Sequence, residues 1–208
     1  MNKVIVVGNL KGGTGKSTLA VNLAAALGGY LLDADLQATA SEWLAQGLLP
    51  VEGRFMPIRG GEVAPWLKEV FKIALRPLVI DLPSNLGPNT AAALAVADLA
   101  VLPVTPSTAD VRATEKALEL LRESRRRRRD GRPRALLAPS KLDLRTRAGR
   151  EFPALLASLG EKVAPAVSQR MAHVEACAAG RWVGDFAPGS PAHKEILALA
   201  QAVAEAAG

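Results

Sequence analysis

The sequence predicts an α/β fold, in which one mostly parallel, twisted sheet is flanked by helices on both faces. Short apolar stretches that end in turn residues alternate with longer stretches of helical period. Most of the short stretches are apolar at nearly every position, which is typical of strands that helices cover on both sides. With 208 residues and no long linker, the chain is expected to form one domain over residues 1–208.

Strands and helices are expected to alternate along the chain. The expected strands are Lys3–Val7, Tyr30–Leu32, Leu78–Leu82, Leu99–Val104, Ala135–Ala138 and Val163–Val167. The expected helices are Ser17–Leu27, Val63–Ala74, Asn89–Ala97, Thr108 to about Arg128, Thr146–Leu159, Met171–Ala179 and Pro191–Ala207. Since such strands join through right-handed crossovers, their carboxyl ends meet at one edge of the sheet, where ligands bind.

A glycine-rich loop, "NLKGGTGKST", follows the first expected strand. Gly12, Gly13 and Gly15 accept backbone conformations that turn N–H groups toward a phosphate, and the helix beginning near Lys16 adds its positive end. Lys16 is expected to neutralise the β- and γ-phosphates, and the Ser17 hydroxyl is expected to hold Mg²⁺. The loop therefore predicts a nucleotide site at the carboxyl edge of the sheet.

Three aspartates lie at or just after the ends of expected strands, at the same edge of the sheet. Asp81 ends the strand in "PLVIDLPSN", where it could hold Mg²⁺ through water, and the following "PSNLG" is suited to sensing a γ-phosphate. In "YLLDADLQ", Asp35 is the candidate for positioning the attacking water and a Mg²⁺-bound water, while Asp33 is a candidate for capping or orienting the loop. Ordinary turn-forming carboxylates remain the alternative for all three residues.

The loop departs from the usual phosphate-binding pattern, which begins with glycine five positions before Gly15. This chain has Leu10 at that position, followed by a second lysine, Lys11. Together with "DADLQ", "VIDLPS" and "VLPVTPS", this loop resembles the ParA/MinD family of deviant Walker P-loop ATPases, and in detail the short plasmid-type ParA partition proteins. Leu36 replaces the proline of the family's "DxDPQ", and "PSK" at 139–141 is a loose match to its base-contacting loop.

The resemblance implies ATP and Mg²⁺ as cofactors, and a homodimer in which Lys11 reaches the phosphates of the ATP held by the other subunit. A second cation would crowd Lys16 unless it pointed away from its own site. Hydrolysis is expected to be slow until a partner stimulates it, with catalytic roles for Lys11, Lys16 and Asp35. The expected Mg²⁺ ligands are Ser17, Asp35 and Asp81. The expected nucleotide-binding residues are Lys11, Gly12, Gly13, Thr14, Gly15, Lys16, Ser17, Thr18, Ser140, Lys141 and Gln169.

Positive charge is concentrated in one part of the chain. The formal charge is +6, but the segment from Arg112 to Arg150 alone carries +9, so the rest is net negative. This distribution indicates either a solvated helix end that the negative helix terminus favours, or a surface for nonspecific double-stranded DNA. The candidate DNA contacts are Arg125, Arg126, Arg127, Arg128, Arg129, Arg147, Arg150, Arg170 and Arg181.

Other side chains are expected to have structural roles. His173 and His193 lack companions at metal-ligand spacing, and Cys177 lies in an alanine-rich stretch where a small buried thiol is the simpler interpretation. The tryptophans are expected to pack. No apolar run approaches the length of a membrane span, and the C-terminal stretch after Lys194 has no cation that could bind anionic lipid, so a cytoplasmic, nucleoid-associated protein is expected.

The function expected from these features is ATP-dependent DNA partitioning. An ATP-bound dimer would bind nonspecific DNA, and a ParB-like centromere-binding or cargo-adaptor protein would trigger hydrolysis and release. The first alternative is a related ATPase that positions another cargo, such as a division-site regulator, a microcompartment or a chemoreceptor cluster. A P-loop metabolic ligase is disfavoured by the localised basic segment, and a metal-cluster carrier is disfavoured by the single cysteine.

Overall fold

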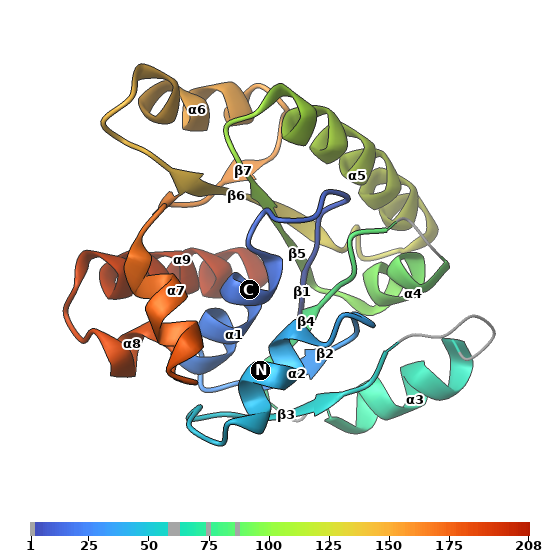
Figure 1. Ribbon diagram of the computed structural model, residues 1–208. Helices are drawn as coiled ribbons and strands as arrows, with labels where there is room; N and C mark the ends of the chain where they lie inside the picture. The colour runs from blue at the N-terminus through green and yellow to red at the C-terminus, as the bar shows by residue number, and fades with distance from the viewer. Residues whose placement is uncertain (1–2, 58–62, 74–75, 86–87) are drawn as a thin grey trace.

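The computed structural model describes residues 3–57, 63–73, 76–85 and 88–208 (Figure 1). The strands are β1 (Val4–Val7), β2 (Tyr30–Asp33), β3 (Glu52–Phe55), β4 (Leu78–Asp81), β5 (Leu99–Val104), β6 (Arg134–Leu142), β7 (Lys162–Val163) and β8 (Val167–Ser168). The helices are α1 (Lys16–Ala26), α2 (Thr39–Ala45), α3 (Val63–Ile73), α4 (Pro88–Val96), α5 (Thr108–Arg127), α6 (Arg147–Ala157), α7 (Met171–Ala178), α8 (Val183–Phe186) and α9 (Pro191–Ala207).

The strands form one parallel sheet, which confirms the predicted fold class. Their order is β3-β2-β4-β1-β5-β6-β7, and β8 pairs with the far end of β6. β1 lies between β4 and β5. The connection that leaves β1 runs toward β2 on the β4 side, whereas the connection that leaves β4 runs in the opposite direction, to β5. At such a reversal the loops after neighbouring strands separate and leave a crevice at their carboxyl ends. The glycine-rich loop follows β1 and therefore lies at that crevice.

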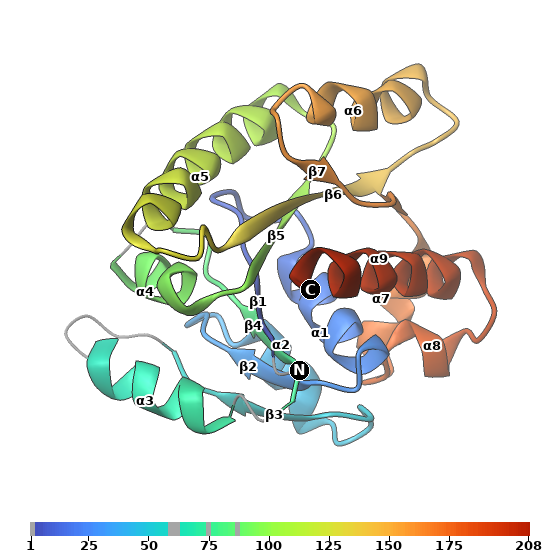
Figure 2. The ribbon, with the colours of Figure 1, turned by 180° about the vertical axis from the view of Figure 1, so that it is seen from behind.

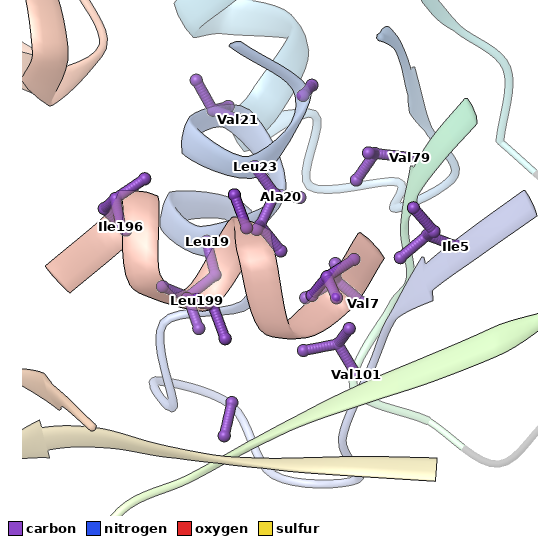
Figure 3. Close-up of a cluster of buried hydrophobic side chains, with 14 of the residues drawn as sticks. Ile5, Val7, Leu19, Ala20, Val21, Leu23, Val79, Val101, Ile196 and Leu199 are labelled. Carbon is purple, nitrogen blue, oxygen red and sulfur yellow. The ribbon is translucent and has the colours of Figure 1, made fainter. Parts of the chain in front are cut away.

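Side chains alternate along each strand and build a separate core on each face of the sheet. On β1, Ile5 and Val7 pack with α1, α2, α8 and α9, whereas Val4 and Val6 pack with α3 to α6. Figures 1 and 2 show the two helix layers on opposite faces, and Figure 3 shows the first core, in which Leu199 of α9 lies close to α1. Because both faces are covered, the central strands β1, β4 and β5 are almost entirely apolar, as the sequence predicts.

The structure corrects several predicted elements. The single strand expected at Val163–Val167 is wrong, because β7 pairs with Leu136 and Leu137 whereas β8 pairs farther along β6, and residues 164–166 between them belong to neither strand. The elements α2, β3 and α8 were not expected. Each has seven or fewer residues, and β3 is a partly exposed edge strand without an apolar pattern. The predicted helix end at Ala74 and part of "PSNLG" lie outside the described residues.

A buried asparagine joins α1 to the start of α8. Asn22 is fully buried, its amide donates to the Thr18 carbonyl at 2.8 Å, and its Oδ1 accepts from the Val183 N–H at 2.9 Å. Val183 is itself buried, so no solvent replaces this bond if it is lost. Asn22 therefore fixes the helix that carries the phosphate loop against the C-terminal part of the chain.

Replacing Asn22 by leucine is expected to lower the free energy of unfolding by about 1–3 kcal/mol, because the Val183 N–H stays buried without an acceptor. Urea unfolding followed by circular dichroism measures the change. The exposed Gln201 on α9 provides the control, since Gln201→Leu is expected to change stability by less than about 0.5 kcal/mol. Equal stabilities for Asn22→Leu and wild type would contradict this role.

Candidate functional site

The glycine-rich loop has the backbone geometry of an anion cradle. Gly13 and Gly15 have φ values of 80° and 94°, a region that side chains disfavour. A Cβ atom on Gly15 would also lie 3.2 Å from the Ser140 Oγ. Gly15 precedes α1, whose first turn has neither an acidic residue nor a side-chain cap. The N-terminal N–H groups of α1 are thus available to a bound phosphate.

Lys16 is a buried cation inside this loop. Its ammonium donates to the Lys11 carbonyl at 3.2 Å and to the Ser84 hydroxyl, and the residue is 6% exposed. Burial lowers the pKa of Lys16, while the charges of Asp81 and Asp35 act in the opposite direction. A charged ligand group at this position would gain from an ammonium that is already oriented and partly dehydrated.

Asp81 is a fully buried carboxylate at the end of β4, in register with Val7 of β1 and Asp33 of β2. Burial raises its pKa to about 7, and the nearby Asp33 and Asp35 charges add to this, although Ser17 and Lys16 act in the opposite direction. The Ser17 hydroxyl lies near Asp81 but outside hydrogen-bond geometry, so neither carboxylate oxygen has a hydrogen-bond partner among the described residues. An orphaned carboxylate of this kind requires an explanation.

Magnesium with a nucleotide fits this arrangement. Among the described residues, no group of three or more His, Cys, Asp or Glu side chains could hold a metal. Mg²⁺ is typically bound by one or two protein ligands together with substrate phosphates and water, rather than by a protein cage. The Asp81 carboxylate and the Ser17 hydroxyl, beside a phosphate cradle, are ligands of that kind.

The other two strand-end aspartates have different surroundings. Asp33 is fully buried, and its carboxylate accepts from the backbone N–H groups of Asp35 at 3.0 Å and Ser41 at 2.7 Å. It therefore orients the loop between β2 and α2, which is the structural role considered from the sequence. Asp35 is half-buried and accepts from the Gln37 N–H at 3.1 Å. Its charge raises the pKa values of Lys16 and Asp81, and its role in positioning water stays a prediction.

Ser140 and Lys141 contact the loop from β6, where the sequence placed the base-contacting segment. The Ser140 hydroxyl donates to the Thr14 carbonyl at 2.9 Å, and the Lys141 ammonium donates to the Gly13 carbonyl at 2.7 Å. Lys141 itself has a left-handed backbone with φ 55°. These contacts brace the cradle, and neither tests the predicted contacts with a nucleotide.

A cavity of about 440 Å³ opens beside the cradle. Its lining includes Gly15, Thr18, Lys141 and Gln169, and its volume suits a small-molecule group such as a nucleoside. His173 and Cys177, which sequence reasoning left without a role, also line it. His173 is buried, its ring nitrogens have no partner among the described residues, and burial lowers its pKa. The sequence around an isolated histidine does not indicate that it lines a cavity.

Lys11 lies apart from the phosphate cradle. Its ammonium is 2.7 Å from the Asp110 carboxylate at the start of α5, and its side chain is 46% exposed. The expectation that Lys11 points away from its own Lys16 agrees with this geometry. The contact with Asp110 had no signal in the sequence, because 99 positions separate the two residues.

Two of the five consecutive arginines, Arg125 and Arg128, contact other elements of the fold, whereas Arg127 pairs with Glu123 of its own helix. Arg125 forms a two-pronged pair with Glu161, with N–O distances of 2.6 and 3.2 Å. Arg128 pairs with Asp130 at 2.6 Å and donates to two backbone carbonyl groups near the end of α4 at 2.8 Å. These side chains hold the end of α5 against the rest of the fold, so they are less available to DNA than the sequence suggests.

The other candidate DNA contacts also include arginines that have partners within the chain and arginines that have none among the described residues. Arg127, Arg147 and Arg170 pair with glutamates, and Arg150 donates to two backbone carbonyl groups. Arg170 is the most constrained of these, since Glu195 holds it at 2.7 Å and is itself largely buried. In the described part of the chain, three candidates have neither an ion pair nor a hydrogen bond from the side chain: Arg126, Arg129 and Arg181.

Replacing Asp81 by asparagine is expected to change how stability depends on pH. Because the pKa of Asp81 is raised from 3.8 to about 7, the folded protein holds this proton more tightly than the unfolded chain does. Its contribution to stability is therefore largest at low pH, falls as the pH rises toward 7, and stays low above that. In protein free of nucleotide and Mg²⁺, wild type should lose stability relative to Asp81→Asn between about pH 5 and 7.5.

Urea unfolding at several pH values measures this difference. Asp130→Asn is the control, because Arg128 holds the pKa of that carboxyl at about 2, outside the pH range tested. A difference between wild type and Asp81→Asn that does not vary with pH would contradict the raised pKa.

The chain is similar to known nucleotide-binding proteins. The family model described as the CobQ/CobB/MinD/ParA nucleotide binding domain matches residues 5–183. The "Chromosome-partitioning ATPase Soj" of Thermus thermophilus is 31% identical over 96% of this chain and 94% of its own length. The "Maintenance of carboxysome distribution protein A" of Gloeobacter kilaueensis is 38% identical, but the match spans only about half of each chain, 52% in both cases.

A solved structure has a similar fold. The structure of the septum site-determining protein MinD of Pyrococcus horikoshii, complexed with Mg-ADP, aligns with a TM-score of 0.78. The alignment covers 100% of this chain and 98% of that chain at 19% identity, which shows a common fold. No helix in the described ranges has the length and apolar character needed to cross a membrane.

Proposed function

Because the chain belongs to the CobQ/CobB/MinD/ParA nucleotide-binding family and is an ATPase that uses ATP and Mg²⁺, we propose that it is a DNA-partitioning switch. ATP joins two copies, the dimer binds nonspecific double-stranded DNA at the nucleoid, and a ParB-like or cargo-adaptor protein stimulates hydrolysis and release. The observation that carries the proposal is the pair of lysines in one loop, which occupy separate environments.

The two lysines suit two different phosphate groups. Lys16 is buried in its own cradle, where it would bind the β- and γ-phosphates of its own nucleotide. Lys11 is half-exposed and lies outside that cradle, so its ammonium is suited to the nucleotide of a second subunit. A cation delivered in this way stabilises the charge that develops on the phosphoryl oxygens in the transition state.

The remaining site residues have roles that follow from their positions. Ser17 and Asp81 would hold Mg²⁺, which when bound neutralises phosphate charge. Asp35 would orient the attacking water. Ser140, Lys141 and Gln169 would contact the nucleoside, since they lie at the loop or line the cavity beside it. No strongly basic catalytic group is evident among these residues, which accords with slow hydrolysis in the absence of a partner.

The relatives support both the DNA role and the first alternative. Soj is described as chromosome-partitioning, and its match covers nearly the whole chain. The carboxysome-distribution relative supports the alternative, in which this chain positions another cargo. Arg126 in the last turn of α5 and Arg129 just after the helix have no ion pair in the described part of the chain, and they are the best candidates for DNA contacts. Arg125 and Arg128 support that helix end instead.

The roles proposed for Lys16 and Lys11 predict that their alanine variants lose different activities. Lys16→Ala is expected to weaken ATP binding about 10- to 100-fold, because a charge-assisted contact with phosphate is removed. Lys11→Ala is expected to keep nucleotide affinity of the monomer within a few-fold, to lose ATP-dependent dimers, and to slow hydrolysis at least about 100-fold. Fluorescent-nucleotide titration, light scattering and phosphate release measure the three quantities. Normal turnover of Lys11→Ala would exclude the role of Lys11 across the dimer.

The DNA role predicts a salt-sensitive mobility shift of random-sequence duplex in the presence of ATP. Arg126→Gln with Arg129→Gln should weaken the shift, and the slope of log affinity against log salt should fall by about 0.9 for each phosphate that is no longer neutralised. Arg54→Gln with Lys72→Gln removes the same charge from the β3 and α3 side and should leave the shift unchanged. A shift unaffected by the α5 substitutions would assign DNA binding to another surface.

A further inference from the structure

A serine hydroxyl from the loop after β4 lies in the phosphate cradle. Ser84 follows Asp81 by three positions, and its Oγ accepts a hydrogen bond from the Lys16 ammonium. The same Oγ lies 3.8 Å from the place that a Cβ atom on Gly12 would take, so it lies against the main chain of the glycine-rich loop. Ser84 is half-buried, and it lines the cradle together with that loop.

The chain on both sides of Ser84 is held in place. Before it, the Leu82 N–H donates to the Val7 carbonyl at 3.0 Å, which fixes the end of β4 to β1. After it, the Asn85 carbonyl accepts from the hydroxyl of Thr90 at 2.7 Å, and Thr90 is a buried residue of α4. The Ser84 hydroxyl is thus presented to the cradle by a segment that has a hydrogen bond on each side of it.

The place of Ser84 corresponds to the far end of a bound triphosphate. Of the described residues, those that line the cavity of about 440 Å³ include Gly15 and Thr18 at the start of α1, but neither Gly12 nor Ser84. A chain of phosphates that begins at this cavity passes the N-terminus of α1 first, and its last phosphate comes to lie near Gly12. The phosphate nearest to Ser84 is therefore the γ-phosphate, which ATP has and ADP lacks.

The chemistry of a hydroxyl suits this place between an ammonium and a phosphate. A serine hydroxyl has two lone pairs that accept hydrogen bonds and one proton that it donates. One lone pair accepts from Lys16, and the proton can be donated to an anionic oxygen. A hydrogen bond to a charged group is stronger than one between neutral groups. Such a site binds the ligand that supplies the acceptor more tightly than a ligand that lacks it.

We propose that Ser84 is a specificity-determining residue for the terminal phosphate of ATP. Its hydroxyl accepts from Lys16 and donates to an oxygen of the γ-phosphate, so that the site binds ATP more tightly than ADP. The proposal rests on the roles proposed above for Lys16 and for the cavity, and it adds a contact from the loop after β4.

The test compares a non-hydrolysable ATP analogue with ADP, each in the presence of Mg²⁺. Ser84→Ala should weaken binding of the analogue about 5- to 20-fold, because one hydrogen bond to a charged group is lost. The affinity for ADP should stay within about twofold of wild type. Competition with a fluorescent nucleotide measures both dissociation constants.

Two further variants complete the comparison. Ser84→Thr retains a hydroxyl and should keep the preference for the ATP analogue within about threefold of wild type. Ser158→Ala is the control, because it removes a serine hydroxyl that makes one hydrogen bond, to the Leu155 carbonyl at 2.7 Å, at the end of α6. Ser158→Ala should bind both ligands like wild type.

Three results would overturn the proposal. Equal losses of affinity for the analogue and for ADP would mean that Ser84 supports the cradle as a whole. Tighter binding of both ligands would mean that the hydroxyl only competes with phosphate for Lys16. Unchanged binding of both would mean that it contacts neither. If Ser84→Ala does not fold, Ser84→Gly is the second variant without a hydroxyl, with the same expected change.

The two lysine variants separate this proposal from those on which it rests. If Lys16→Ala binds both ligands like wild type, the assignment of the cradle to phosphate fails. If Lys16→Ala weakens both while Ser84→Ala keeps the preference for the analogue, only the role of Ser84 is excluded. Measuring Ser84→Ala again in the Lys11→Ala background, where dimers are expected to be lost, reports the γ-phosphate contact independently of dimerisation.

Discussion

Lys16 lies buried beside two carboxylates at the end of a parallel sheet, and the need to compensate these charges constrains the surrounding chain. The glycines allow main-chain N–H groups to face the same point, and Asp33 uses its own carboxylate to order the next loop. Asp81 has no such partner among the described residues, and burial raises its pKa. The fold therefore holds an imbalance of charge that a nucleotide with Mg²⁺ would correct.

Ion pairs within the chain reduce the number of basic side chains that are available to bind DNA. A count of charges treats all five arginines from 125 to 129 alike, yet Arg125 and Arg128 are anchored to Glu161, Asp130 and backbone carbonyl groups. Arginine suits such roles because its planar group makes several hydrogen bonds at once. Some arginines of the segment therefore stabilise the fold and others are exposed. The net charge of the segment is larger than the positive charge that is available to bind a polyanion.

Much of the fold and the centre of the site could be predicted from sequence, because both depend on local patterns. The apolar strands and the loop "NLKGGTGKST" are contiguous, so β1, α1 and the positions of Lys16 and Asp81 follow from them. The short elements α2 and β3 could not be predicted, since their positions depend on packing and edge pairing. Contacts between distant residues, such as Lys11 with Asp110, need the topology to bring them together.

Helix α5 carries Asp110 in its first turn and the arginines in its last. With 20 residues it is a rod about 30 Å long, and Figure 1 shows it as one unbroken element along the outside of the sheet. A tilt of about 5° at the loop end of such a rod displaces its far end by about 2.5 Å. A single rigid helix thus connects Asp110, which contacts the phosphate loop, with the exposed cations at the other end of α5.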